Sequence, residues 1–474
     1  MSPSPARRRV AAISAALAIL AAGGLAALLW RGVGRPKAAG AGSASAPAIV
    51  FIVVDMLRAD RLSSCGYGRP TTPNLDAFAR GEGAAATCRA YAPGTWTLPS
   101  HASFFTGEEV PIHGADFMLH AEGKPSVSLW GEPARPLAGE FRTLAEKLGA
   151  RGYETVLVSG NPIVSQRAAT GLARGFDVVR DAARFGDLYG KALVGKLDDA
   201  LAEAQARGKP IFLFVNVADA HHPWLPIPDG VGWVPPRAGL DNRPRLPETF
   251  YPRFLRGQLD AGQRQSFLEH AVDSYDYAVF RADRTFGAVL AVLDRRGLLA
   301  GPNRIVVTSD HGELLGEHEL VGHGLFVREG ISRVPLMFRA SEGAAVRLDP
   351  AAPISALTAH DLVLGGALPK APRAVRAAGF PDGLLVELFG ADRFGSAHAA
   401  AWDAMEKIEW SDAGFSRIDL GADPGEDRPA PLAADAPGRP ALERFVARIQ
   451  ETADRAGAPS KEMIESLRAL GYVQ

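Results

Sequence analysis

The feature that most constrains the fold is an uninterrupted apolar run over residues 48–54 that ends in the carboxylate of Asp55. Such a run is typical of a parallel strand that is buried on both faces. Similar runs follow at residues 154–159, 211–217 and 303–309, and helical patterns lie between them, at residues 141–149 and 263–296. Strands that alternate with helices predict an α/β fold with a mainly parallel sheet sandwiched by helices.

Acidic residues and histidines follow three of these predicted strands. Asp55 follows the first, Asp219 with His221 follows a second, and Asp310 with His311 follows a third. In open α/β sheets, ligands bind beyond the carboxyl ends of the strands. One acid after one strand is commonly a turn or cap residue, but three such strands are hard to explain by capping alone. We therefore expect these side chains to lie along one rim of the sheet.

The segment over residues 94–107 predicts an extended stretch that runs into a short helix. Pro99 lies where a helix can begin, because the first helical residues need no N–H donor, and Gly107 closes the helix. Thr97 then lies at the helix start, where the dipole and unpaired N–H groups attract an anion such as a phosphate or sulfate ester. The alternative is that Thr97 is only an N-cap residue.

The N-terminal part of the chain differs in composition from the rest. An uncharged, alanine-rich run at residues 10–30 follows three consecutive arginines and has about the length that crosses a bilayer. We expect residues 1–9 to be cytoplasmic, residues 10–30 to be a single transmembrane anchor in the cell (inner) membrane, and residues 31–47 to be a linker. The catalytic part would then be periplasmic or extracellular. Basic residues on both sides of the run leave the orientation open, and the alternative is a cleaved export signal, including one of the twin-arginine kind.

The remaining organisation is less sharply defined. The pattern weakens after about residue 340, which predicts a catalytic domain over residues 48–345 and a small C-terminal α+β subdomain over residues 346–474. Short strands are expected at residues 401–419, with closing helices at residues 442–453 and 461–470. A length of 474 residues allows more than one core.

Charge and cysteine content limit the possible partners. A formal net charge of -1 excludes the basic character of a nucleic-acid-binding protein. Cys65 and Cys88 are the two cysteines, and neither belongs to a CxxC pair. They form one disulfide if the domain is exported, or remain two buried thiols. The sequence does not indicate an oligomeric state.

Several blocks, in this order along the chain, resemble the sulfatase family of the alkaline phosphatase superfamily. They are residues 54–60, 72–76, 97–107, 152–153, 216–223, 308–313, 322–324, 418–426 and 467–473. The resemblance covers about residues 48–474. It implies an alkaline-phosphatase-like fold and a metal-dependent hydrolase of anionic esters.

The chain departs from the sulfatase pattern at the nucleophile. The family motif C/S-x-P-S/A-R, whose first residue becomes formylglycine, corresponds here to Thr97 through His101. Threonine cannot be converted to formylglycine. Relatives with threonine at this place include nucleotide pyrophosphatase-like phosphodiesterases, phosphonoacetate hydrolases and phosphoglycerol or phosphoethanolamine transferases. Resemblance to these relatives implies phosphate esters, a Thr97 nucleophile and a phosphothreonine intermediate.

The resemblance also implies a metal site. Its expected ligands are Asp55, Thr97, Asp310 and His311. Sulfatases usually have a second Asp and an Asn where this chain has Met56 and His311, so it departs twice from the calcium-binding set. Mixed oxygen and nitrogen ligands suit zinc or manganese better than calcium. One ion is favoured over two, because the Asp219-x-His221 spacing is shorter than in the two-zinc relatives.

Further site residues are expected around the ester. His221 and His323 are the candidates for the group that protonates or stabilises the leaving oxygen. Substrate contacts are expected from His101, Asp219, His221 and His323. Two other hypotheses remain, which are sulfate-ester hydrolysis without formylglycine and an inactive sulfatase-like binding protein. Apart from the ester substrate, the expected partner is the membrane, through the N-terminal helix.

Overall fold

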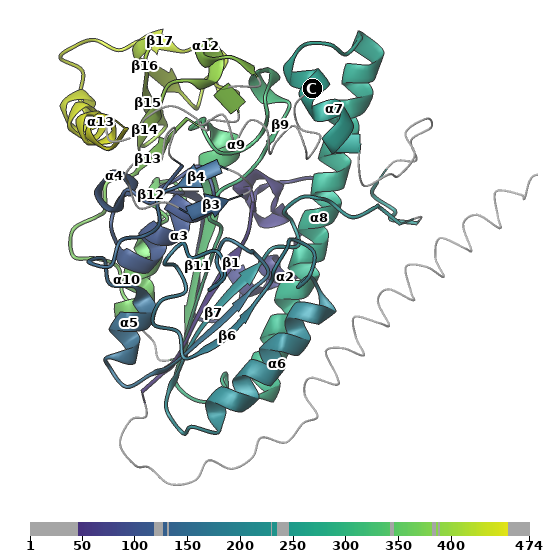
Figure 1. Ribbon diagram of the computed structural model, residues 1–474, viewed down its shortest axis with the longest axis vertical. Helices are drawn as coiled ribbons and strands as arrows, with labels where there is room; N and C mark the ends of the chain where they lie inside the picture. The colour runs from purple at the N-terminus through teal and green to yellow at the C-terminus, as the bar shows by residue number, and fades with distance from the viewer. Residues whose placement is uncertain are drawn as a thin grey trace, which may run out of the picture. The chain divides into compact units, whose positions relative to one another are not determined.

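The computed structural model describes residues 46–117, 127–129, 132–228, 230–234, 246–341, 346–381, 385–386 and 389–453 (Figure 1). The predicted membrane anchor at residues 10–30 and the predicted helix at residues 461–470 lie outside the described residues. Within the described ranges, no helix has both the length and the apolar character that a membrane span requires.

The core is a mixed sheet with the strand order β12-β2-β11-β8-β1-β7-β5-β6. The strands from β8 to β6 in this order run parallel, whereas β11 is antiparallel to both β8 and β2. The bounds are β1 (Ala48–Val54), β2 (Ala84–Tyr91), β5 (Glu154–Ser159), β6 (Val178–Asp181), β7 (Ile211–Val217), β8 (Asn303–Thr308), β11 (Arg333–Ala340) and β12 (Ile354–Ser355). The predicted strands and the mainly parallel sheet are confirmed.

Helices cover both faces of this sheet (Figure 1). One set of β1 side chains, Val50, Ile52 and Val54, packs with residues of α2, α6 and α8. The alternate set, Ile49, Phe51 and Val53, packs with residues of α3, α5 and α10. The bounds are α2 (Pro73–Ala79), α3 (Thr97–Thr106), α5 (Leu144–Gly149), α6 (Lys191–Gln205), α8 (Ala261–Arg295) and α10 (Thr358–Gly365). Burial on both faces explains why β1 is apolar without alternation.

Local capping sets where two predicted helices begin. Thr143 and Glu146 form a capping box, so α5 begins at Leu144 and not at the predicted residue 141. Asp260 and Gln263 form a second capping box at the start of α8, two residues before the predicted start. The predicted helices are present, and side-chain caps determine their first residues.

A separate antiparallel sheet, with the order β13-β14-β15-β16-β17, forms the C-terminal region. Its strands are β13 (Arg376–Gly379), β14 (His398–Asp403), β15 (Glu406–Ser411), β16 (Gly414–Asp419) and β17 (Ala430–Pro431), and α13 (Arg439–Ala453) packs on it. The predicted strands at residues 401–419 are therefore present. The C-terminal subdomain was expected to begin at residue 346. However, β12 and α10, which lie after that position, pack with the main sheet, and the second sheet begins only at β13.

Short elements connect these parts. They are η1 (Ala59–Arg61), η2 (Ser63–Cys65), α4 (Val110–His113), β3 (Val127–Leu129), β4 (Glu132–Ala134), α7 (Leu246–Leu255), β9 (Leu314–Leu315), η3 (Glu317–Glu319), β10 (Val321–Gly322), α9 (Glu329–Ser332) and α12 (Ala391–Phe394).

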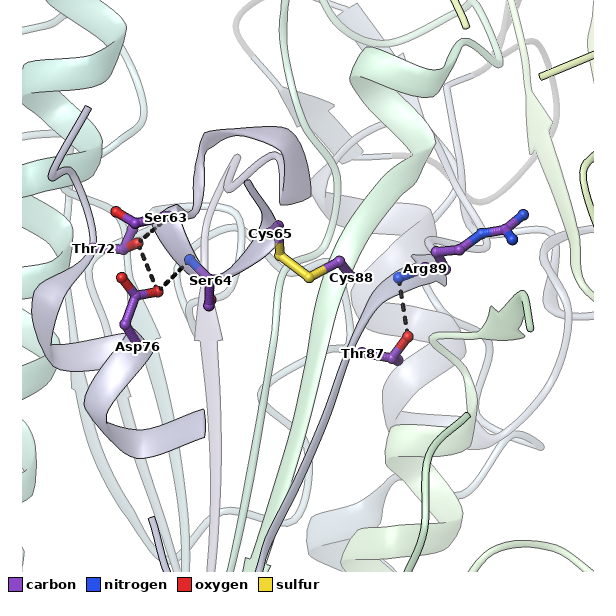
Figure 2. Close-up of a disulfide and its surroundings, with 8 residues drawn as sticks. All are labelled: Ser63, Ser64, Cys65, Thr72, Asp76, Thr87, Cys88 and Arg89. Atoms are coloured by element: carbon purple, nitrogen blue, oxygen red, sulfur yellow. Dashed lines mark hydrogen bonds between the residues drawn. A yellow bond between two sulfur atoms is a disulfide. The ribbon is translucent and has the colours of Figure 1, made fainter. Parts of the chain in front are cut away.

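A disulfide joins Cys65 at the end of η2 to Cys88 in β2, as Figure 2 shows. The two cysteines are 23 positions apart in the sequence. Beside the bridge, the backbone N–H of Ser64 donates to the carboxylate of Asp76 at 3.0 Å. Of the two alternatives for the cysteines, the structure has the disulfide.

Candidate active site

A buried cluster of three side chains lies at the carboxyl ends of the two central strands. Asp55 follows β1 directly, and Asp310 and His311 follow β8. Ligand atoms of the three lie within 4.8 Å of one another. His311 Nε2 is 3.5 Å from Asp310 Oδ2 and 3.9 Å from Asp55 Oδ1. Because β1 and β8 are parallel neighbours, their ends place these residues together, as the sequence predicted.

One atom of each cluster member is left without a hydrogen bond. Asp55 Oδ1, Asp310 Oδ2 and His311 Nε2 are buried and have no hydrogen-bond partner among the described residues. The other oxygen of Asp55 accepts hydrogen bonds from the side-chain amides of Asn161 at 2.6 Å and Asn216 at 3.1 Å. Buried polar atoms without partners cost free energy. Three adjacent ones, all with metal-ligating chemistry, therefore fit a bound cation.

The electrostatics of the cluster support the same conclusion. Burial raises the pKa of Asp55 to about 7, and the carboxylate of Asp310 adds to the rise. Burial also raises the pKa of Asp310 to about 6 and lowers the pKa of His311 well below its ordinary value. A divalent cation stabilises the ionised carboxylates and takes the neutral imidazole as a ligand. The raised pKa values of the two carboxyl groups therefore fit a site at which a bound cation would stabilise their ionised forms.

Thr97 is the first residue of α3, and Trp96 occupies the N-cap position. The alternative that Thr97 is the N-cap is therefore wrong. Its hydroxyl oxygen Oγ1 accepts a hydrogen bond from Asn161 Nδ2 at 3.0 Å, and the same nitrogen donates to Asp55 Oδ2. The expected C-cap is confirmed, because Gly107 ends α3 with a φ of 83°. The Thr97 hydroxyl thus lies one amide group away from Asp55, at the N-terminus of a helix.

His101, a buried residue of α3, contacts both the backbone of α3 and a member of the cluster. Its Nδ1 lies 2.9 Å from the carbonyl oxygen of Thr97 and 3.5 Å from Asp310 Oδ2, so this nitrogen carries the proton. Its Nε2 is 3.3 Å from the amide nitrogen of Asn216. Burial lowers the pKa of His101 to about 4, which keeps the ring neutral. Its expected contact with substrate stays a prediction.

His323 lies against the cluster, with its ring centroid 4.3 Å from that of His311. The buried carboxylate of Glu313 accepts a hydrogen bond from His323 Nδ1 at 2.8 Å. Burial alone would lower the pKa of His323, but the Glu313 carboxylate raises it above the ordinary value. Glu313 also accepts a hydrogen bond from the hydroxyl of Tyr251 at 3.4 Å. Glu313 therefore orients His323 beside the proposed metal ligands and favours its protonated form.

His221 lies next to His323, with ring centroids 5.5 Å apart. Its ring stacks on Phe185, with centroids 3.8 Å apart, and its Nδ1 is 2.6 Å from the carbonyl oxygen of His222. Burial lowers the pKa of His221 well below its ordinary value. The predicted pair His221 and His323 is thus brought together, and the two environments shift their pKa values in opposite directions.

The carboxylate of Asp219 is held by protein donors and lies outside the cluster. It accepts hydrogen bonds from the backbone N–H of Gly190 at 3.0 Å and from the hydroxyl of Thr285 at 3.1 Å, and Arg281 lies at 3.4 Å. Burial raises the pKa of Asp219 to about 6. Three protein groups already contact this carboxylate. The expected contact of Asp219 with substrate stays a prediction.

Sequence analysis assigned no role to Asn161 and Asn216, which contact the site directly. Asn161 lies two residues after β5, and Asn216 is the last residue but one of β7. Both strands end at the same rim as β1, because β7 runs parallel to β1 and β5 runs parallel to β7. A search of the strand ends for amides, as well as for acids and histidines, would have found both.

Comparison with known proteins gives the family. The sulfatase profile matches residues 47–366. A segment of 45 residues is 38% identical to the uncharacterized sulfatase YidJ of Escherichia coli (strain K12), and it spans 10% of this chain and 9% of that protein.

Solved structures share the fold. The phosphonate monoester hydrolase of Agrobacterium radiobacter superposes with a TM-score of 0.57 at 20% identity, over 86% of this chain and 96% of that chain. The phosphonate monoester hydrolase of Silicibacter pomeroyi gives a TM-score of 0.58 at 19% identity, over 87% and 96%. A protein in complex with its substrate D-glucosamine-2-N,6-O-disulfate gives 0.59 at 18% identity, over 88% and 99%. With the profile match over most of its length, the chain belongs to the sulfatase family.

Proposed function

We propose that this chain is a metal-dependent hydrolase or transferase of phosphate esters with Thr97 as its nucleophile. The observation that carries the proposal is the shared amide of Asn161, which donates to both Thr97 Oγ1 and Asp55 Oδ2. The hydroxyl thus lies one amide group away from Asp55, and Asp55, Asp310 and His311 each have a buried atom that lacks a hydrogen bond within the described structure. Because threonine cannot become formylglycine, the usual sulfatase nucleophile is absent at this position, which favours phosphate over sulfate esters.

Asp55, Asp310 and His311 would hold one divalent cation, with Thr97 as a further oxygen ligand. Two carboxylates, a hydroxyl and an imidazole suit zinc or manganese better than calcium. Among the described residues, these three side chains form the group of acids and histidines whose ligand atoms are close enough to share one ion. When bound, the ion would lower the pKa of the Thr97 hydroxyl and polarise the ester.

The protein's own residues then account for the reaction. Thr97 Oγ1, after losing its proton to water, attacks phosphorus, and the new Oγ1–P bond forms as the bond to the leaving oxygen breaks. His323, whose protonated form Glu313 favours, donates a proton to the leaving oxygen, and His221 is the second candidate for this role. Water or an acceptor alcohol then attacks the phosphothreonine and releases Thr97.

We further propose that the protein is exported and anchored through residues 10–30. The Cys65–Cys88 disulfide supports export, because disulfides persist in oxidising compartments and are rare in the cytosol. A reporter fused to the C-terminus should be active only outside the cytoplasm. Cytoplasmic activity of the reporter would reverse the proposed orientation.

The test of the nucleophile is to trap the covalent intermediate. A slowly reacting phosphate ester is mixed with the enzyme, the reaction is quenched in acid, and peptide mass analysis should locate an added phosphoryl group on Thr97. Thr97→Ala should keep the fold and metal but lower turnover by several orders of magnitude. Thr97→Ser should retain part of the activity because the oxygen remains. Turnover of Thr97→Ala at the wild-type rate would refute the covalent route.

Parallel assays with aryl phosphate monoesters, phosphate diesters and aryl sulfates test the substrate class. We expect phosphate esters to react faster than the matched sulfate. A preference for the sulfate would replace the phosphate proposal with sulfate-ester hydrolysis. No turnover of either class, together with no bound metal, would instead indicate an inactive sulfatase-like binding protein.

A further inference from the structure

The side-chain amide of Asn161 contacts the proposed nucleophile directly. We propose that Asn161 is a catalytic residue, whose N–H stabilises negative charge on Thr97 Oγ1 in both halves of the reaction. This inference rests on the proposed function, since it assumes that Thr97 is phosphorylated.

The orientation of the Asn161 amide is fixed by its surroundings. Asn161 is fully buried, and its side-chain oxygen accepts a hydrogen bond from the backbone N–H of Ile163 at 2.9 Å. The hydroxyl of Ser159 accepts from the backbone N–H of Asn161 at 3.1 Å and donates to its carbonyl at 2.9 Å. With the oxygen turned toward Ile163, the amide nitrogen must face Thr97 and Asp55. The donor is therefore in place before the reaction begins.

The two N–H groups of the Asn161 amide donate to two different acceptors. One is donated to Asp55 Oδ2, which also accepts from Asn216 Nδ2 at 3.1 Å. The other is donated to Thr97 Oγ1 at 3.0 Å. Losing Asn161 therefore leaves Asp55 with a second amide donor, whereas Thr97 Oγ1 loses its contact with an amide. The effect of Asn161 on the nucleophile can thus be separated from its effect on the proposed metal ligand.

Thr97 Oγ1 is charged at both ends of the reaction. It is an alkoxide before it bonds to phosphorus, and it becomes one again when water attacks and the P–Oγ1 bond breaks with its electron pair on Oγ1. One proton of the attacking water is then taken up by Oγ1, and the other stays on the released phosphate. A fixed donor at Oγ1 stabilises both charged states. For an aryl ester with a good leaving group, the first half is fast, so loss of the donor should make phosphothreonine accumulate.

The experiment compares Asn161→Ala and the isosteric Asn161→Asp with Asn216→Ala in the full-length, metal-loaded protein. Asn216→Ala is the matched control, because it removes a donor from the same oxygen of Asp55 without contacting Thr97. Asn161→Asp keeps the oxygen that accepts from Ile163, which protects the local fold. The measurements are steady-state turnover of an aryl phosphate, the fraction of Thr97 phosphorylated after acid quench, metal content and thermal unfolding.

We expect both Asn161 variants to lose about 100-fold in turnover, the scale on which one preorganised donor acts. Their phosphorylated fraction should exceed that of wild type, while Asn216→Ala keeps the wild-type fraction. Equal losses and equal fractions in all three variants would overturn the role of Asn161 and leave Thr97 as nucleophile, as would wild-type turnover in both Asn161 variants. If the wild type turns over esters without any phosphorylated Thr97, the proposed function fails, and the role of Asn161 fails with it.

Discussion

Two buried groups of charged side chains in this protein are built in opposite ways. In the C-terminal sheet, the ammonium group of Lys407 is fully buried and donates to Glu426 at 2.5 Å, to Glu409 at 2.9 Å and to the carbonyl of Val327 at 2.6 Å. Its three N–H donors are all used. In the Asp55–Asp310–His311 cluster, each side chain instead keeps an atom that no described residue hydrogen-bonds.

The pKa values express the same difference. Burial alone would lower the pKa of Lys407, but Glu426 and Glu409 raise it above the ordinary value. Burial opposes the ionisation of Glu409, yet Lys407 lowers its pKa to about 2. At Asp55 burial dominates, and the pKa rises to about 7. The C-terminal group carries its own counter-charges, whereas at the cluster the proposed metal ion would supply them.

The largest expected effect is that of removing one carboxylate charge from the cluster. Asp310→Asn should abolish most metal binding and lower turnover by more than about 100-fold, since changes to residues that merely support a ligand already cost about 10- to 100-fold. Compared with metal-free wild type, its stability should not fall, because an unpaired buried charge is removed. Metal analysis after dialysis, with activity and urea unfolding, checks this. Asp219→Asn is the control and should keep its metal, so full metal content and rate in Asp310→Asn would place the site elsewhere.

For Lys407→Met we expect the reverse, which is a loss of stability with unchanged metal content and turnover. This change removes the ammonium group that Glu426 and Glu409 share, so the free energy of unfolding should fall by about 3–5 kcal/mol. Turnover per folded molecule and metal content should stay at the wild-type level, because the substitution lies outside the cluster. Urea unfolding measures the loss, and Lys370→Met, at an exposed position, should change stability by at most about 0.5 kcal/mol. If Lys407→Met lowered the free energy of unfolding as little as Lys370→Met, the contacts of Lys407 with Glu426 and Glu409 would not contribute to stability.

Removal of the disulfide should lower stability without affecting either group of charged side chains. Replacing Cys65 and Cys88 by Ser opens a loop of 23 positions, which should lower the free energy of unfolding by about 3 kcal/mol. Metal content and turnover should be unchanged at temperatures where the variant is folded. Urea unfolding of the wild type with and without reductant should give the same difference, and no difference would show that the bridge does not form in solution.

The smallest expected effect is a dependence of stability on pH through Glu409. Its pKa is about 2 in the folded protein, against 4.5 for an unperturbed glutamate. The stabilisation is therefore complete above pH about 4.5 and is lost as the pH falls toward 2, since the unfolded chain takes up the proton first. Urea unfolding of wild type and Glu409→Gln between pH 7 and 3 should show a difference that narrows below pH about 4.5. A constant difference would contradict this assignment.

Much of the fold and part of the site follow from the sequence for a physical reason. Apolar runs such as that of β1 identify buried parallel strands, and parallel strands present their carboxyl ends at one edge. Asp55, Asp310 and His311 could therefore be placed together. Asn161 could be recognised as a polar residue after a strand, but its contact with Thr97 could not be predicted, because that contact depends on the order of β5, β7 and β1 in the sheet and no local pattern specifies strand order.

The C-terminal group shows a second limit of prediction. Lys407 and Glu426 are 19 positions apart, and in the sequence they look like the surface charges that most lysines and glutamates are. Their burial depends on how the second sheet packs near Val327, which no local pattern of the sequence specifies. The cysteines likewise allowed two alternatives until the approach of η2 to β2 was known.

Strand β1 is paired along its length with β7 on one side and β8 on the other. Backbone amides in such a position exchange their hydrogens with solvent only when the whole domain opens. The strands that carry Asp55 and Asp310 should thus be among the last to exchange in deuterium. Removal of the proposed metal should leave this slow exchange unchanged. The metal-free protein should then bind the ion again without refolding, because the central sheet stays folded.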